Sequence, residues 1–183
     1  MPKITQQRTV FEGKRFKVKS YEVDFGQGKK ATFEAIDRNN GALIVPLDDE
    51  GNIVLIKEYC AGTGSYELGL PKGMVDDGEE PLAAAKRELT EETGLKAAKL
   101  DKLAVFTTTP AWSNQRTHVF LARELTPSKL QGDEHEQPQI VKKLFSKFEQ
   151  LVDNGELTEA RVISALFLAR RFLEKEGKHK LQK

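Results

Sequence analysis

The sequence has very little cysteine and almost no net charge. Its 183 residues include one cysteine, Cys60, so no disulfide can form within the chain. The 29 Lys and Arg residues nearly balance 28 Asp and Glu residues, which leaves a net charge of +1. A chain without a basic excess creates no field for nonspecific nucleic-acid binding, and we therefore expect no nucleic-acid partner.

Long hydrophobic runs are also absent. No stretch of about 18 apolar residues is available to span a membrane, and no apolar N-terminal segment suggests export. We therefore expect no membrane partner and a reducing, cytoplasmic location. Hydrophobic residues make up 38% and charged residues 31% of the chain. This composition is typical of a globular protein, and the length suits one domain with a real core.

One short segment contains an unusual concentration of carboxylates. Glu88, Glu91 and Glu92 stand at i, i+3 and i+4, which places them on one face of a helix. Like charges at this spacing repel one another, and a bound cation explains them best. Hard divalent ions such as Mg²⁺ prefer carboxylate oxygens and keep several waters, which leaves room for a phosphate-bearing substrate. A solvated acidic helix face is the alternative for these three residues alone.

The same segment carries the end signals of a helix. Pro81 suits the first helical turn, where its missing N–H costs little. Gly94 suits the C-terminus, where a left-handed residue is often needed. The face opposite the glutamates carries Leu82, Ala85 and Leu89, which we expect to bury against a sheet.

Residues 73–95 resemble the signature of the Nudix hydrolases. The matching positions are Gly73, Glu79, Arg87-Glu88-Leu89, Glu91-Glu92 and Gly94-Leu95. The resemblance implies hydrolysis of a nucleoside diphosphate linked to another group, with Mg²⁺ or Mn²⁺ as the metal cofactor.

Roles for the metal-facing residues follow from this resemblance and from helix geometry. Glu88 and Glu92, one turn apart, form the best pair for holding an ion, and Glu91 adds a ligand or binds through water. By resemblance, the main-chain carbonyl of Lys72 is a further ligand. A metal on these glutamates would lower the pKa of a bound water, which makes Glu91 and Glu92 candidate catalytic residues.

Two further parts of the motif are expected to shape the site. By resemblance, Arg87 pairs with Glu79 and fixes the loop onto the helix. Gly73 ends an apolar stretch and is expected to let the backbone turn tightly near the metal and substrate.

The order of elements predicts an α/β (α+β) protein, and the resemblance implies the Nudix fold. In that fold a mixed β-sheet is sandwiched between helices, here with an N-terminal antiparallel sheet. The apolar run 42–47 is expected to be a buried strand with 53–59 as its hairpin partner. The other expected strands are 15–19, 21–25, 31–36, 100–108 and 117–124, and the other expected helices are 142–154 and 159–177.

We expect one domain over residues 1–183, with N-terminal strands in 1–40 and the core in 41–183. In the ADP-ribose pyrophosphatase branch of the Nudix family, which segments described below resemble, the N-terminal strands often pair across a dimer. The resemblance therefore implies a homodimer.

Segments outside the signature resemble the ADP-ribose pyrophosphatase branch. Pro110 stands 15 residues after Leu95, and a proline near this distance marks that branch. Residues 58–69 and 159–168 are closer still to the bacterial ADP-compounds hydrolases. This resemblance implies an ADP-containing substrate (ADP-ribose, diadenosine oligophosphates or NADH), with AMP and a second phosphorylated product.

Some positions depart from the branch. ADP-ribose pyrophosphatases usually carry Arg where this chain has Cys60, Glu where it has Gly69, and often Glu where Gln115 stands. A missing Arg removes a bidentate contact to phosphate or ribose. We therefore favour a looser preference for ADP-linked compounds over strict ADP-ribose specificity.

Two more groups of site residues come from the resemblance. Phe33 and Glu34 match positions that recognise adenine, through ring stacking and a hydrogen bond to the exocyclic amine; Phe33 as plain strand core is the alternative. The acidic loop 133–136 resembles the branch's catalytic loop. Glu134 is expected to be the general base and Glu136 an additional metal ligand, and the reverse assignment of these two stays open.

Two other functions remain open from the sequence. One is a Nudix hydrolase of another nucleotide class, such as a GDP-sugar, a nucleoside triphosphate or capped RNA. The other is a non-catalytic nucleotide-binding module, although such modules usually lose signature glutamates that are all present here.

Overall fold

The computed structural model describes residues 1–128 and 137–180. Its backbone divides into two compact units. The N-terminal unit contains Met1–Asn40 and Thr107–Thr117, and the core unit contains Gly41–Phe106 and His118–Lys183. Whether the two units act as one domain stays a prediction.

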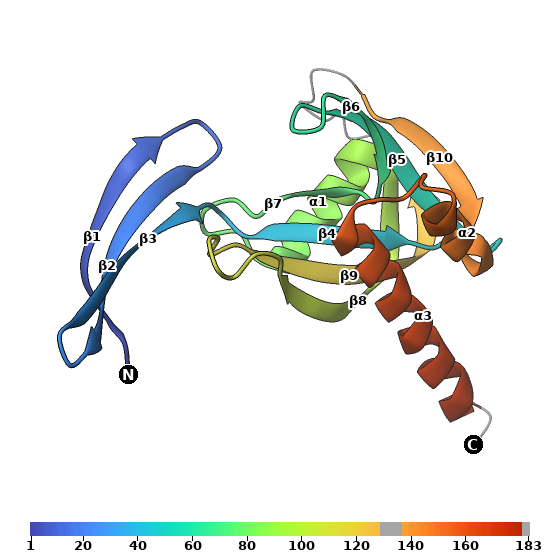
Figure 1. The fold of residues 1–183 in the computed structure, drawn as a ribbon. Helices are drawn as coiled ribbons and strands as arrows, with labels where there is room; N and C mark the ends of the chain where they lie inside the picture. Colours follow the sequence, from blue (N-terminus) through green and yellow to red (C-terminus); the bar gives the residue numbers. More distant parts are fainter. Residues whose placement is uncertain (129–136, 181–183) are drawn as a thin grey trace. The chain divides into compact units, whose positions relative to one another are not determined.

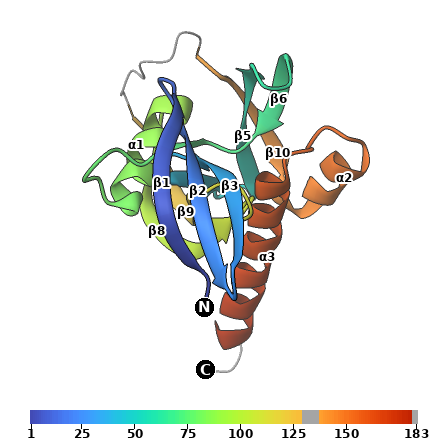
Figure 2. The ribbon, with the colours of Figure 1, turned by 60° about the vertical axis from the view of Figure 1, so that its left-hand side comes forward.

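The N-terminal unit is built on an antiparallel sheet of three strands, which lie side by side in Figure 2. The strands are β1 (Lys3–Glu12), β2 (Lys17–Gly26) and β3 (Lys29–Asp37). This confirms the expected N-terminal antiparallel sheet. The strands expected at 15–19 and 21–25 are in fact one strand, since β2 pairs continuously with β3 from Lys17 to Asp24.

The loop that contains Pro110 is anchored to β3. The N–H of Ile36 donates to the carbonyl of Trp112 at 2.8 Å, and the N–H of Asn114 donates back to Ile36 at 3.2 Å. Pro110 itself lies in a turn that is closed by the carbonyl of Thr109. The loop therefore packs as an extra segment along this sheet.

The described residues of the core unit form two sheets and three α-helices (Figure 1). One sheet has the strand order β7-β4-β9-β8, and the other has the order β10-β5-β6. The strands are β4 (Gly41–Pro46), β5 (Asn52–Cys60), β6 (Ser65–Gly69), β7 (Lys72–Met74), β8 (Leu95–Thr107), β9 (Arg116–Pro127) and β10 (Gln139–Leu144). The helices are α1 (Pro81–Thr93), η1 (Phe145–Lys147, a 3₁₀ turn), α2 (Phe148–Asp153) and α3 (Ala160–Lys180).

Strand β4 is buried on both faces, as its continuous apolar sequence predicts. Its residues alternate between two apolar clusters because successive side chains of a strand point to opposite faces. Ala42 and Ile44 pack with α1, while Leu43 and Val45 pack with β5 and the later helices. Helices therefore cover both faces of this strand, which places α1 and its glutamates against the sheet.

Three local expectations are wrong. Residues 53–59 are not a hairpin partner of β4, because β5 pairs with β6 and β10 in another sheet. An isolated bridge joins Ile53 to Leu47, the residue after β4. Part of the expected helix 142–154 is strand, since Lys142–Leu144 complete β10 against β5. Leu82 is 42% exposed, so the buried apolar face of α1 begins at Ala84 and Ala85.

Candidate active site

Helix α1 begins and ends where the sequence predicts. Pro81 is its first residue, and Gly94 follows its last residue in the left-handed conformation with φ of 66°. The N–H of Gly94 donates to the carbonyl of Thr90 at 2.8 Å, which satisfies a carbonyl at the end of the helix. Both end signals therefore act as expected.

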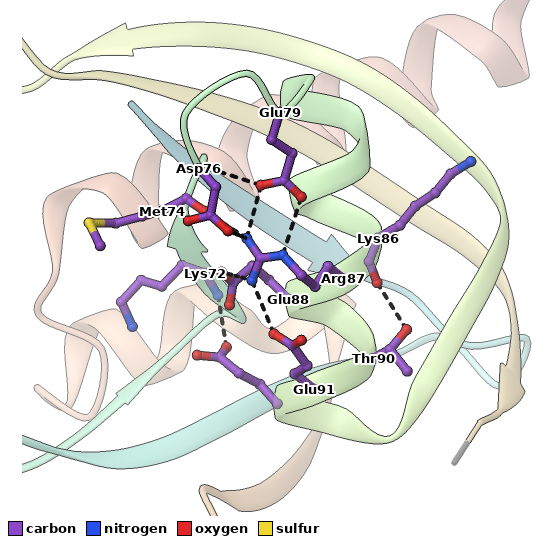
Figure 3. A network of polar contacts seen from close by, with 10 residues as sticks. Lys72, Met74, Asp76, Glu79, Lys86, Arg87, Glu88, Thr90 and Glu91 are labelled. Atoms are coloured by element: carbon purple, nitrogen blue, oxygen red, sulfur yellow. Dashed lines mark hydrogen bonds and ion pairs between the residues drawn. The ribbon is translucent and has the colours of Figure 1, made fainter. Parts of the chain in front are cut away.

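Arg87 ties the loop before α1 to the helix (Figure 3). Its Nε and Nη2 donate to the two carboxylate oxygens of Glu79 at 3.2 and 3.0 Å, and Nη2 also donates to the carbonyl of Met74 at 2.9 Å. Its Nη1 donates to Glu88 at 2.7 Å and to Glu91 at 3.1 Å. The expected Arg87–Glu79 pair is present in a bidentate form, which is the stronger geometry.

Gly73 lies where the carboxylate of Glu88 comes closest to the backbone. A Cβ atom on Gly73 would lie 2.0 Å from the Cδ of Glu88, much closer than any real contact. The expected tight turn at Gly73 is wrong, because this residue lies in β7 and pairs with Ala42. Its role is to leave room for Glu88, whose side chain is only 10% exposed.

The carboxylate of Glu92 is buried against Lys72, the residue that precedes Gly73 in β7. Its Oε2 accepts a hydrogen bond from the N–H of Lys72 at 2.9 Å. Burial raises the pKa of Glu92 to about 8, against the lowering effects of the Lys72 N–H and ammonium. Burial makes the negative charge of this carboxylate costly, and a cation bound next to it would offset that cost.

An ion pair between Glu58 and Lys72 lies beside these glutamates, and the sequence analysis did not predict it. The ammonium of Lys72 pairs with the carboxylate of Glu58 on β5, and both side chains are partly buried. The only sequence signal is Glu58 itself, a charge that follows the apolar run of β5. The pairing depends on how β5, β6 and β7 are placed, which the sequence pattern does not give.

The expected metal ligands can be tested for fit. The carboxylates of Glu88 and Glu92 both end at β7, one against Gly73 and the other at the N–H of Lys72. Two buried carboxylates at adjacent strand residues are a donor set that suits a hard divalent cation. Within residues 1–128 and 137–180, no three His, Cys, Asp or Glu side chains already stand in a metal-holding arrangement. In this structure Glu88 and Glu91 are instead bound by Arg87.

The remaining candidate residues lie elsewhere. Phe33 and Glu34 are exposed on β3, and Pro110 is exposed in its turn, all within the N-terminal unit. Glu134 and Glu136 lie outside the described residues. The structure therefore brings together the expected residues of the core unit, from Lys72 to Gly94.

The fold and this site define a class of protein. It is an α/β protein in which a glutamate-bearing helix packs on a sheet and is held by an arginine clamp. The model of the NUDIX domain matches residues 37–169. The chain belongs to the Nudix family and is a Nudix hydrolase.

Relatives over nearly the whole chain support this membership. The chain is 36% identical to ADP compounds hydrolase NudE of Escherichia coli over 97% of its own length and 96% of the relative's length. It is 30% identical to an ADP-ribose pyrophosphatase of Bacillus subtilis, with 90% of each chain covered. A crystal structure of an ADP compounds hydrolase superposes with a TM-score of 0.88 at 36% identity, covering 96% of each chain.

No helix in the part of the chain that the structure describes is both long and apolar enough to cross a membrane.

Proposed function

We propose that this protein hydrolyses the pyrophosphate bond of ADP-linked compounds and releases AMP and a phosphorylated product. The observation that carries the proposal is the meeting of the Glu88 and Glu92 carboxylates at β7. The relatives from Escherichia coli and Bacillus subtilis described above are named for ADP compounds and ADP-ribose, which supports the choice of substrate class. ADP-ribose, diadenosine oligophosphates and NADH are the proposed substrates.

The proposed cofactor is Mg²⁺, with Mn²⁺ as a substitute. Glu88, Glu91, Glu92 and the carbonyl of Lys72 would hold it. A bound divalent cation would offset the charge of the pyrophosphate and lower the pKa of a bound water. Because Arg87 now binds Glu88 and Glu91, it would have to share these carboxylates with the cation.

The residues of the chain contribute position and charge. Arg87 keeps the loop before α1 in place through Glu79 and Met74, so the glutamates are held at β7 before the substrate arrives. Such preorganisation lowers the cost of reaching the reactive geometry. We assign proton removal from the attacking water to Glu134 and additional metal binding to Glu136.

We assign adenine recognition to the N-terminal unit. Phe33 offers an exposed ring for stacking, and it already contacts the ring of Phe25 at a centroid distance of 6.1 Å. Glu34 is the next residue of the strand and therefore points to the opposite face of the sheet. A base stacked on Phe33 would thus lie on the other face of the sheet from Glu34. We therefore propose that Phe33 stacks on the base, and that Glu34 and Pro110 contact other parts of the substrate.

A homodimer formed through the N-terminal unit is part of the proposal. This small sheet exposes several large apolar side chains: Ile4, Val10, Phe11, Phe16, Phe25 and Phe33. Apolar surface of this kind is typical of a protein interface. Sedimentation analysis should give twice the monomer mass, and a monomer at micromolar concentration would contradict the dimer.

A substrate panel tests the activity. Purified protein with Mg²⁺ would be offered ADP-ribose, diadenosine triphosphate, NADH, GDP-mannose, dGTP and capped RNA, and products would be resolved by chromatography. We expect AMP from several ADP-linked compounds and little product from the others. Cleavage mainly of GDP-mannose, dGTP or capped RNA would show that ADP-linked compounds are not the preferred substrates. Tight nucleotide binding without turnover would indicate a non-catalytic module.

A further inference from the structure

The Glu58–Lys72 ion pair has no place in the proposed reaction so far, although it lies beside a proposed metal ligand. Glu58 is on β5 and Lys72 on β7, in two different sheets of the core unit. Both side chains are partly buried, with 31% of Glu58 and 21% of Lys72 exposed. Both charges lose part of their hydration in this pair, so its presence alone is weak evidence that it stabilises the fold.

Lys72 is connected to Glu92 in two ways. Its backbone N–H donates to the Glu92 carboxylate at 2.9 Å, and its ammonium also acts electrostatically on that carboxylate. A lysine side chain has a flexible four-carbon stem and three rotatable donors. Because the backbone of Lys72 already touches Glu92, the same stem can bring the ammonium onto that carboxylate unless another group holds it.

Glu58 is the group that holds the ammonium. The carboxylates of Glu58, Glu159 and Glu92 all act electrostatically on the Lys72 ammonium. Of these acids, Glu58 makes the direct contact. Glu159 is engaged by Arg161, which forms an ion pair with it.

The surroundings leave room for this arrangement. A Cβ atom on Gly69 would lie 3.6 Å from the Lys72 ammonium and 3.9 Å from a methyl group of Val162. Both are ordinary van der Waals distances, so Gly69 borders the ammonium without obstructing its contact with Glu58.

We propose that Glu58 is a positioning residue, which holds the Lys72 ammonium away from the Glu92 carboxylate and so keeps that carboxylate available to a divalent cation. The inference rests on the proposed function, because it requires Glu92 to be a metal ligand. Without Glu58, the ammonium would compete with the cation for Glu92.

Calorimetric titration of the full chain with Mn²⁺, without substrate, tests this directly. Glu58→Gln keeps the volume but loses the charge, and we expect the Kd for Mn²⁺ to rise about tenfold, as when an opposite charge moves next to a carboxylate. Lys72→Met removes the competing ammonium and should bind Mn²⁺ at least as tightly as wild type. The double variant Glu58→Gln/Lys72→Met should bind like Lys72→Met, because Glu58 acts only through Lys72.

Glu67→Gln is the matched control. Glu67 lies directly opposite Glu58 in the β5–β6 pairing, but its carboxylate accepts from Ser65 and not from Lys72. Glu67→Gln removes one negative charge from the face of the sheet that carries Glu58. The Kd for Mn²⁺ should stay within about twofold of wild type, the size of a screened surface effect. Thermal unfolding of each variant checks the fold, and recovery of affinity in the double variant excludes a folding defect.

The outcomes separate this inference from the proposed function. If Glu92→Gln abolishes Mn²⁺ binding and Glu58→Gln binds like wild type, the positioning role is wrong and the metal site stands. An equal loss from Glu58→Gln in the presence and absence of Lys72 would also overturn it, since Glu58 would then act on the metal itself. If Lys72→Met leaves metal affinity intact but raises KM, with Glu58→Gln doing the same, the pair serves the substrate instead. If Glu92→Gln binds Mn²⁺ like wild type, the ligand set of the proposed function fails.

Discussion

Gly73 and Glu88 approach each other so closely that any side chain at position 73 would force the Glu88 carboxylate to move. A Cβ atom there would lie 2.0 Å from the Cδ of Glu88 and within 2.2 Å of both its carboxylate oxygens. Strand β7 and helix α1 are thereby packed with a carboxylate directly against a bare backbone. The first glycine of the Nudix signature is thus explained by close approach, not by a turn.

Gly73→Ala should therefore displace the Glu88 carboxylate. We expect weaker Mn²⁺ binding and at least about a tenfold loss of turnover, because a misplaced site residue is costly even when it remains present. Gly62→Ala is the control, since a Cβ there meets nothing within 4 Å. Activity on ADP-ribose and calorimetric metal binding would measure both. Normal metal binding by Gly73→Ala would show that the carboxylate of Glu88 is not needed at this position.

Glu92→Gln should separate catalysis from folding. The amide oxygen can still accept the Lys72 N–H, so thermal stability should be kept. Turnover with saturating metal should fall by about 10²–10⁴-fold, the range for loss of a group that helps to activate water. Glu80→Gln, an exposed acid just before α1, is the control. Near-full activity of Glu92→Gln would contradict the mechanism.

Arg87→Lys should weaken the attachment of the loop to the helix. Lysine cannot reproduce the bidentate contact to Glu79 together with the bond to the Met74 carbonyl. We expect the free energy of unfolding to fall by about 1–3 kcal/mol, because charged partners are left unpaired. Urea unfolding at neutral pH measures the change. The reverse exchange Lys86→Arg, one residue earlier on the exposed side, should be neutral, and equal stability of both variants would contradict the clamp.

A separate network should make stability depend on acid pH. Arg123 donates to Glu176 on α3 and to Asp101 on β8, each at 2.6 Å. Arg123, and then Lys99, lower the pKa of Glu176 to about 2. Because the pKa in the folded state lies below the unfolded value, this stabilisation is present above about pH 4.3. It is lost as the pH falls from there towards 2.

The pH dependence can be isolated with Glu176→Gln. Urea unfolding from pH 6 to pH 2.5 should show that wild type is more stable at pH 6 and that the difference shrinks as the pH falls. Glu174→Gln, an exposed acid on the same helix, should follow wild type throughout. A difference between wild type and Glu176→Gln that does not change with pH would contradict the role of this carboxylate.

Local features of the sequence determined much of the core unit. The ends of α1 follow from Pro81 and Gly94, because a missing N–H and a left-handed backbone are properties of single residues. The apolar stripe of α3 also follows from its period, and Val162, Leu166 and Ala169 are all fully buried. The Arg87–Glu79 pair could be predicted by resemblance, because the whole Nudix signature lies within one short segment.

The tertiary structure alone decided which strands are neighbours. The apolar run that begins residues 53–59 indicates a strand, but long-range packing determines its partners. The strand pairs with β10 and β6 and not with β4. Lys142–Leu144 became strand for the same reason, since pairing with β5 outweighs a weak helical period. Sequence spacing carries no information about such partners.

The same division holds within the site. The sequence alone determined that Glu88, Glu91 and Glu92 share a helix face, because the helical repeat fixes their direction. Only the tertiary structure decided that this face meets Gly73 and Lys72. The close approach at Gly73 and the contact of Glu58 with Lys72 arise between segments whose distance depends on how the two sheets and α1 pack, and packing is a property of the whole fold.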